Sequence, residues 1–324
     1  MKDAVIGIDI GGTFTKYGIV DREGNCLAES FTNTSIHNNF DDYLRDLHAA
    51  IEKSMQFLKG QIEIRGVGIG APNGNYYAGS IENAVNLNWR GTVPVVEKMK
   101  TYYPGLTIVL TNDANAAAIG EMVFGGAKNM KDFVVITLGT GLGSGIVVGG
   151  TLVYGHDGFA GELGHVNVQL NGRDCGCGKK GCLEAYASAT GIRRTVFWLL
   201  SERMIDSELR DISFNNLTAK MISEAALKGD KIALEAFDHT GWILGLKLAD
   251  TVAHNSPEAI FLLGGLANAR EMIINPTKKY MEENLLPVFK NKVNILLSSL
   301  PDMNAGVLGA GALAWNELDR RKHT

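Results

Sequence analysis

AVIGIDIGGT, residues 4–13, and FVVITLGTG, residues 133–141, are the two stretches of sequence that decide the expected fold. Each is an apolar run that ends in a glycine turn and is followed by a second apolar run, a pattern that predicts strand, tight turn and strand. When the stretches are aligned on their glycines, Gly11 falls on Gly139. The recurrence indicates two related α/β halves, each opening with a β-hairpin whose glycine turn faces a cleft.

Further helices and strands extend each half. Residues 41–58 carry apolar side chains at helical spacing, and residues 231–254 form the longest expected helix. We therefore expect an N-terminal α/β domain over residues 1–115 and a C-terminal α/β domain over residues 116–324. The last expected helix, at 305–318, has small residues on one side, so we expect it to pack closely near the N-terminal domain.

Composition limits the partners and the compartment. The chain has 324 residues and a net charge of -4, which gives no electrostatic footprint for nucleic acid. No apolar run reaches membrane-spanning length, and the sequence enters its first strand without a signal peptide. We expect a cytoplasmic protein with reduced thiols that binds neither nucleic acid nor membrane.

Both glycine turns could bind phosphate, because the N–H groups of consecutive glycines can converge on an anion with no side chain in the way. The first turn, at 11–13, has Asp9 and Lys16 beside it, and the second spans 139–143. Neither is a Walker loop, since no GKS or GKT occurs. The alternative is that each turn is only a tight hairpin. Two turns at matching places favour phosphate binding.

Three of the four cysteines, Cys175, Cys177 and Cys182, lie close together, and His165 lies just before them. In a reducing compartment, clustered cysteines are typical of metal ligands rather than disulfides. A set of three cysteines and one histidine suits a closed tetrahedral zinc site, which leaves no open position for catalysis. We therefore expect a structural zinc; the alternative is a loop of reduced cysteines. Cys26 stands alone and is expected to be an inert packing residue.

Three carboxylates are candidates for chemistry. Glu162 and Glu184 flank the cysteine cluster, so a bound metal would hold both near it. Carboxylates accept hydrogen bonds from sugar hydroxyls, although a lone glutamate is more often a solvated surface residue. Asp113 follows a strand and begins a helix, where functional side chains of open α/β sheets gather. It could orient an attacking hydroxyl as a base, or simply cap the helix.

Four motifs resemble the ROK family of bacterial sugar kinases and repressors, which belongs to the actin/hexokinase-like ATPase superfamily. They are DIGGT at 9–13, LGTGLGSGIVVGG at 138–150, GELGH at 161–165 and CGCGKKGCLEAYAS at 175–188. The resemblance covers nearly the whole chain and implies two actin-like (ribonuclease H-like) domains with an interdomain cleft for sugar and ATP. Repressor members carry an N-terminal helix-turn-helix domain. This chain starts at its first strand, so we expect no DNA-binding domain.

The resemblance also implies roles for single residues. Asp113, within NDANAAA, is implied as the catalytic base, and magnesium is implied with ATP, near Asp9 through water. The implied sugar ligands are Asn112, Glu162, Glu184 and His165, the last also a zinc ligand, with Asn83 of the loop at 72–89 expected to line the pocket. The implied nucleotide site comprises Asp9, Gly11, Gly12, Thr13, Lys16, Gly139, Thr140, Gly141, Gly143, Gly264 and Gly265.

The sequence is therefore interpreted as an ATP-dependent hexose kinase with structural zinc, and a homodimer or homotetramer is expected. The motifs look most like those of glucokinase members, which would form glucose 6-phosphate. Fructose, mannose, allose, N-acetylglucosamine and N-acetylmannosamine stay open as substrates, as does polyphosphate as the donor. A sugar sensor that binds without phosphorylating is the alternative of another class; the intact NDANAAA stretch disfavours it.

Overall fold

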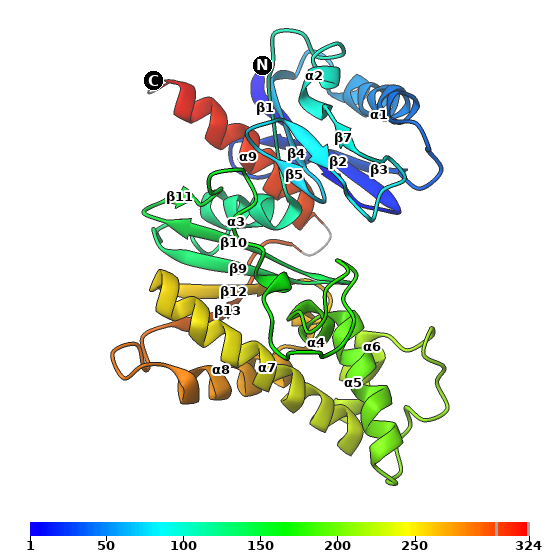
Figure 1. The fold of residues 1–324 in the computed structure, drawn as a ribbon. Helices are drawn as coiled ribbons and strands as arrows, with labels where there is room; N and C mark the ends of the chain where they lie inside the picture. Colours follow the sequence, from blue (N-terminus) through cyan, green and yellow to red (C-terminus); the bar gives the residue numbers. More distant parts are fainter. Residues whose placement is uncertain (302–303, 323–324) are drawn as a thin grey trace. The chain divides into compact units, whose positions relative to one another are not determined.

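The computed structural model describes residues 1–301 and 304–322 and divides into two compact units (Figure 1). Unit 1 comprises Met1–Met130, Leu152–Ala160 and the described part of Ser299–Thr324. Unit 2 comprises Lys131–Thr151 and Gly161–Ser298. Residue 115, where the sequence suggested a boundary, lies inside a helix of unit 1.

Unit 1 is built on a five-stranded sheet with the strand order β3-β2-β1-β4-β8. The hairpin β1–β2 is antiparallel, and β1, β4 and β8 run parallel to one another. The strands are β1 (Lys2–Ile10), β2 (Phe14–Asp21), β3 (Cys26–Asn33), β4 (Ile62–Gly70) and β8 (Thr107–Thr111). A small antiparallel sheet accompanies them, made of β5 (Gly74–Asn75), β6 (Ser80–Glu82) and β7 (Thr92–Val93).

The two faces of this sheet bury different helices, because side chains alternate along a strand. Ile6 and Ile8 of β1 belong to the same buried cluster as Leu44 and Leu47 of α1. Val5, which directly precedes Ile6, lies on the other face in a cluster with α9. The helices of unit 1 are α1 (Phe40–Met55), η1 (Gln56–Leu58), α2 (Val95–Met99), α3 (Asp113–Val123) and α9 (Ala305–Lys322).

Helix α9 approaches the sheet so closely that glycine is needed beneath it. A Cβ on Gly68 would lie 1.8 Å from the Ala310 carbonyl oxygen, and one on Gly7 would lie 2.3 Å from that of Val307. Small residues on α9 therefore let its backbone rest on β1 and β4. Helix α9 thus lies in close contact with these two strands.

Unit 2 repeats the strand order in its own sheet, β11-β10-β9-β12-β13. As in unit 1, an antiparallel hairpin, β9–β10, adjoins two parallel neighbours. The strands are β9 (Phe133–Leu138), β10 (Leu142–Val148), β11 (Thr151–Leu152), β12 (Ala259–Leu263) and β13 (Asn294–Leu297). The expectation of two related α/β halves, drawn from two glycine turns, is confirmed.

The helices of unit 2 form a separate layer of the fold, in which α7 and α8 lie side by side (Figure 1). Gly241 on α7 accommodates the ring of Pro276, which lies inside α8. No described helix is long and apolar enough to span a bilayer. The helices are η2 (Leu163–His165), α4 (Glu184–Ala187), α5 (Ala189–Glu202), α6 (Ala219–Leu227), α7 (Lys231–Asn255), η3 (Ala267–Ala269) and α8 (Glu271–Asn284).

Candidate functional site

The first glycine turn joins β1 to β2 and lies directly beneath another loop. The Gly11 N–H donates to the Phe14 carbonyl oxygen at 3.0 Å, which closes the hairpin. A Cβ on Gly12 would lie only 2.5 Å from the Asn86 carbonyl oxygen. The loop at 72–89 therefore passes so close to Gly12 that no side chain would fit there. The turn is therefore a tight hairpin that protein atoms partly cover, and phosphate binding at it stays a prediction.

Two carboxylates lie at the carboxyl ends of parallel strands in unit 1. Asp9 is the next-to-last residue of β1, and Asp113 begins α3 directly after β8. The N-cap of α3 is Asn112, whose side-chain oxygen accepts from the Asn115 N–H at 2.7 Å. Asp113 is therefore relieved of the capping role and is exposed, while its Oδ1 accepts from the Ala114 N–H at 2.8 Å.

The surrounding protein raises the pKa of both carboxyls. Loss of hydration is the main cause at Asp9, and the nearby charge of Asp113 adds to it, so that the pKa of Asp9 rises to about 6 despite the opposing charge of Lys16. At Asp113, protein atoms crowd a side chain that solvent still reaches, and the pKa rises above its usual range although the Ala114 N–H opposes the shift. Two carboxyls with raised pKa values beside a glycine turn are typical of a functional site.

The raised pKa of Asp9 predicts that its charge destabilises the free protein. Because this carboxyl binds its proton more tightly in the folded state, the folded protein loses stability as the pH rises from 3.8 to about 6. The shift from 3.8 to about 6 corresponds to roughly 3 kcal/mol at high pH, as an upper bound. We expect Asp9→Asn to raise the thermal midpoint by several degrees at pH 8 and by about a third as much near pH 4.5.

Thermal unfolding without ligands, at both pH values, measures this effect. Asp211→Asn is the matched control, because it removes an exposed carboxylate and should leave the midpoint unchanged. An Asp9→Asn protein that is equally stable or less stable at pH 8 would contradict the assignment of a burial cost to Asp9.

Other predicted residues of unit 1 are placed less tightly. Lys16 pairs with Asp9 across the β1–β2 hairpin and is exposed. Thr13 is exposed at the turn. Asn83 is exposed in a left-handed conformation, with φ of 50°, and its N–H donates to the Gly91 carbonyl oxygen. These side chains are accessible to a ligand, and Asn83 stays a prediction as a sugar contact.

In unit 2, the second glycine turn holds the carboxylate of Glu184. The Leu142 N–H donates to Glu184 Oε2 at 2.9 Å, and a Cβ on Gly141 would lie 2.3 Å from the same oxygen. The Ala189 N–H, at the start of α5, donates to the Gly139 carbonyl oxygen at 2.9 Å. The turn and the segment 184–189 are thus fastened together by two hydrogen bonds.

The other residues predicted to bind nucleotide in unit 2 lie at the same end of the sheet, and they differ in how far protein atoms surround them. The Gly143 N–H donates to the Thr137 hydroxyl at 3.0 Å. A Cβ built on Gly139 has no neighbour within 4 Å, and Thr140 is exposed. Gly264, with φ of 100°, follows β12 and lies against the Leu138 backbone at the end of β9. Next to it, Gly265 is exposed, so the two glycine segments that the sequence assigned to nucleotide share one edge of the sheet.

The GELGH segment is attached to strand β10 beside the same turn. The Ser144 hydroxyl donates to the Gly161 carbonyl oxygen and accepts from the Leu163 N–H. These contacts fix the start of η2, from which Glu162 and His165 project. Ser144 lies within the motif at 138–150, but its contact with Gly161 joins residues 17 positions apart, and no local pattern marks it.

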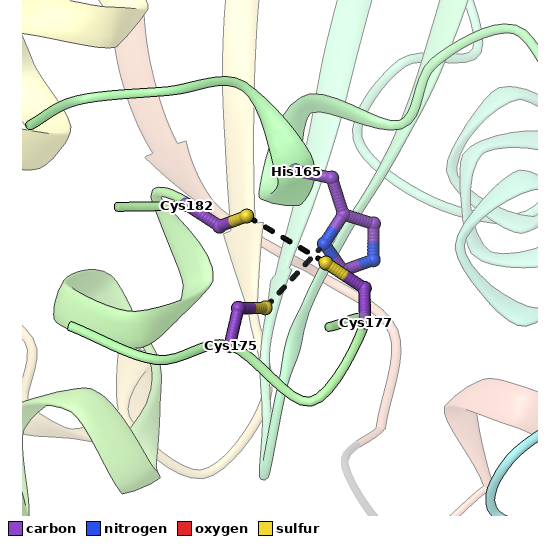
Figure 2. Close-up of side chains that lie close together, drawn as sticks. All are labelled: His165, Cys175, Cys177 and Cys182. Carbon is purple, nitrogen blue, oxygen red and sulfur yellow. Dashed lines mark hydrogen bonds between the residues drawn. The ribbon is translucent and has the colours of Figure 1, made fainter. Parts of the chain in front are cut away.

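Figure 2 shows His165, Cys175, Cys177 and Cys182 converging from η2 and the cysteine loop. The Cys177 and Cys182 sulfurs are 3.7 Å apart, and the Cys175 sulfur is 3.7 Å from His165 Nδ1. All four donor atoms lie within 4.8 Å of one another. Sulfurs bound to one tetrahedral zinc, with bonds of about 2.3 Å, are about 3.8 Å apart. The four predicted ligands are brought together in an arrangement that fits a tetrahedral metal ion.

The two nitrogens of the His165 ring face different groups. Nδ1 faces the Cys175 sulfur, whereas Nε2 is 4.0 Å from the Glu162 carboxylate, which is exposed. Glu184 is likewise shared, because its Oε1 lies 3.5 Å from the Cys175 sulfur while its Oε2 is held by the glycine turn. The metal-type cluster thus borders both glutamates that the sequence singled out.

Known proteins are similar to this chain over nearly its whole length. The ROK family model matches residues 5–317. A glucokinase of Halalkalibacterium halodurans is 34% identical over 312 residues, which cover 95% of this chain and 94% of that protein. The xylose repressor of Bacillus subtilis is 27% identical over 95% of this chain and 76% of its own length.

A solved structure gives the same result. The ROK family glucokinase from Streptomyces griseus, in complex with glucose and AMPPNP, has a TM-score of 0.81 and 33% identity, covering 97% of this chain and 99% of that one. The chain belongs to the ROK family, as its motifs indicated, and it has the α/β fold of that family's sugar kinases.

Proposed function

We propose that this protein is an ATP-dependent glucokinase that forms glucose 6-phosphate. The observation that carries the proposal is Asp113, an exposed carboxyl with a raised pKa that is freed from helix capping by Asn112. Full-length similarity to glucokinases supports the choice of glucose among hexoses. A related ROK protein with bound glucose and AMPPNP supports ATP as the donor.

Within unit 1, Asp113 accepts the proton of the attacking hydroxyl. The pKa of Asp113 is raised towards neutral pH, and a general base is more effective when its pKa is near the working pH. Asn112 Oδ1 is occupied by the cap, so its amide N–H₂ group is the part that can donate to a sugar hydroxyl. Asp9 and the turn at 11–13 receive the nucleotide phosphates, and magnesium, when bound, neutralises charge that develops during transfer.

Within unit 2, Glu162, His165 and Glu184 bind the sugar, and the turn at 139–143 binds nucleotide. His165 Nδ1 and the three cysteines would hold zinc, which would keep the loop that carries these side chains in place. His165 Nε2 is then left free of the metal and can interact with a hydroxyl. Glu184 also positions the glycine turn by accepting from the Leu142 N–H. One carboxylate therefore acts on both the sugar site and the nucleotide site.

An ADP-release assay across a panel of hexoses and amino sugars tests the proposal. We expect turnover with ATP and magnesium, with the highest kcat/KM on glucose. The same panel with polyphosphate in place of ATP identifies the donor. A higher kcat/KM on another sugar would reassign the substrate, and no turnover on any sugar would remove the kinase assignment.

A non-catalytic sugar sensor is the second candidate, because the xylose repressor is also similar over 95% of this chain. Calorimetry with glucose and xylose separates the two functions. Sugar binding without ADP release from any sugar would favour the sensor, whereas rapid ADP release excludes it.

Replacing Gly141 by alanine should damage the sugar site through Glu184. The new methyl group would lie 2.3 Å from Glu184 Oε2, so the carboxylate must leave the Leu142 N–H. Losing one charge-assisted hydrogen bond costs about 1.5–3 kcal/mol, which predicts at least a tenfold rise in the KM for glucose. Gly139→Ala is the control, because its methyl group meets no protein atom within 4 Å. Equal glucose KM values for the two variants would contradict the positioning role of Glu184.

A further inference from the structure

A cluster of three buried hydroxyl groups lies close to the first glycine turn of unit 1. The hydroxyl of Thr15, on β2, is 2.8 Å from that of Thr34 and 2.8 Å from that of Tyr43 on α1, so it is hydrogen-bonded to both. All three side chains are buried. A hydroxyl that is shielded from water costs free energy unless it is hydrogen-bonded. The three groups therefore hold one another in place, and they join β2, the segment after β3 and α1 at one point.

The segment that Thr34 anchors is bonded directly to the glycine turn. The N–H groups of Thr34 and Ser35 both donate to the Thr13 carbonyl oxygen, at 2.8 and 3.3 Å. In addition, Asn88 Nδ2 donates to the Ser35 carbonyl oxygen at 2.9 Å. The Thr13 carbonyl is thus held towards residues 34–35 by two hydrogen bonds.

The direction of this carbonyl affects how well the turn can accept an anion. Converging N–H groups attract a phosphate, whereas a carbonyl oxygen that points at the same place repels it. Glycines at 11 and 12 allow many backbone conformations, so the turn alone does not fix the peptide that follows Thr13. Its hydrogen bonds to residues 34–35 supply this constraint.

The hydroxyl cluster also lies near the carboxylate beside the turn. Burial is the main cause of the raised pKa of Tyr43, and the charge of Asp9 adds to it. Thr15 pairs across the hairpin with Ile10, which directly follows Asp9. The cluster is therefore close to both parts of the expected phosphate site in unit 1, the turn and the carboxylate.

We propose that Thr15, Thr34 and Tyr43 are positioning residues for nucleotide binding. They anchor residues 34–35, which keep the Thr13 carbonyl oxygen directed at that segment rather than at a bound phosphate. Because the three side chains are buried, they act through the backbone of the turn and not by contact with the nucleotide. The inference rests on the proposed function, since it requires that the turn at 11–13 receives the phosphates of ATP.

Calorimetric titration with AMPPNP and magnesium, in the absence of sugar, tests the proposal on two variants of Thr34. Valine has the shape of threonine but no hydroxyl, so we expect Thr34→Val to raise the Kd about three- to tenfold. Serine keeps the hydroxyl and loses only a methyl group, so Thr34→Ser should retain most of the affinity. Unchanged affinity in Thr34→Val, equal losses in the two variants, or a wild type that does not bind AMPPNP would overturn the proposal.

Tyr43→Phe removes a second hydroxyl of the cluster, and Tyr17→Phe is its matched control. Tyr17 is also a buried residue, and its hydroxyl is 3.5 Å from that of Ser54 on α1. Both variants lose a hydroxyl that joins β2 to α1, so a lower thermal midpoint is expected of either. Only Tyr43→Phe should also raise the Kd for AMPPNP, by about threefold or more. Equal Kd values for the two variants would show that the cluster stabilises the fold alone.

Turnover distinguishes failure of this inference from failure of the proposed function. In an active enzyme, Thr34→Val should raise the KM for ATP more than it lowers kcat, and it should leave the KM for glucose unchanged. If no sugar supports ADP release but the wild type binds AMPPNP, the kinase assignment fails, and the two Thr34 variants still decide the inference. If the wild type is active and Thr34→Val has its KM for ATP, only the inference fails.

Discussion

Asp113→Asn is expected to lower kcat by about two to four orders of magnitude while glucose binding stays within a few-fold of the wild type. Asparagine keeps the shape of the side chain and can still accept from the Ala114 N–H, but it cannot take the proton of the attacking hydroxyl. Steady-state kinetics and calorimetry with glucose measure the two quantities. A kcat within tenfold of the wild type would remove Asp113 as the base.

The same variant should not be less stable. Loss of hydration disfavours the charge of Asp113, so a neutral side chain should leave the thermal midpoint equal or higher. A lower midpoint together with lost glucose binding would point to a structural role instead. Thermal unfolding therefore separates loss of catalysis from loss of fold.

The pH dependence of kcat/KM gives an independent check on the base. Asp113 must be ionised to accept a proton, so activity should fall as the pH falls through its pKa, which is raised above the usual carboxyl range. Asp9, with a pKa of about 6, would titrate in the same region. The profile of Asp9→Asn distinguishes them, because an acidic limb that remains in this variant belongs to Asp113.

Cys177→Ser has the second largest expected effect, which is loss of the bound metal. We expect the purified wild type to contain about one zinc per chain and the variant to contain well below half of that. Cys177 is exposed, so the substitution removes little packing, and a lower thermal midpoint would report the missing metal rather than a cavity. The KM for glucose should rise, because the segment that carries Glu162, His165 and Glu184 is no longer held in place by the metal.

Cys26→Ala is the matched control for this experiment. Cys26 lies in unit 1, outside the cluster, and its half-buried thiol has a pKa raised to about 11, mainly by burial. Its replacement should leave the zinc content unchanged. Elemental analysis of wild-type protein prepared without chelators that finds no zinc would show that the cysteines have another role.

Local chemistry in the sequence was enough to predict the hairpins, the metal-type cluster and the position of Asp113. Glycine turns and clustered cysteines are patterns of a few neighbouring residues, so the sequence reveals them without knowledge of the tertiary structure. Asn112 and Asp113 are both good helix caps, and only the backbone decides that Asn112 takes this role. The contact of Glu184 with Leu142 joins residues 42 positions apart, and no local pattern marks it.

Tertiary packing also overrides local preference in α8. Pro276 lies inside this helix, where the sequence would have suggested a break, because the facing Gly241 leaves room for its ring. The pairing of α9 with β1 depends likewise on contacts across almost the whole chain. The choice of sugar depends on the shape of side-chain surfaces, which composition and spacing do not encode.

The contact of α9 with β1 has a consequence for synthesis on the ribosome. The strand at the start of the chain is covered by a helix at residues 305–322, and all of Gly161–Ser298 is translated between them. Unit 2 can therefore complete its sheet while the first strands of unit 1 still lack their covering helix. In a nascent chain, the glycine-lined face of β1 and β4 stays uncovered until α9 has emerged, which leaves it open to non-native contacts in the meantime.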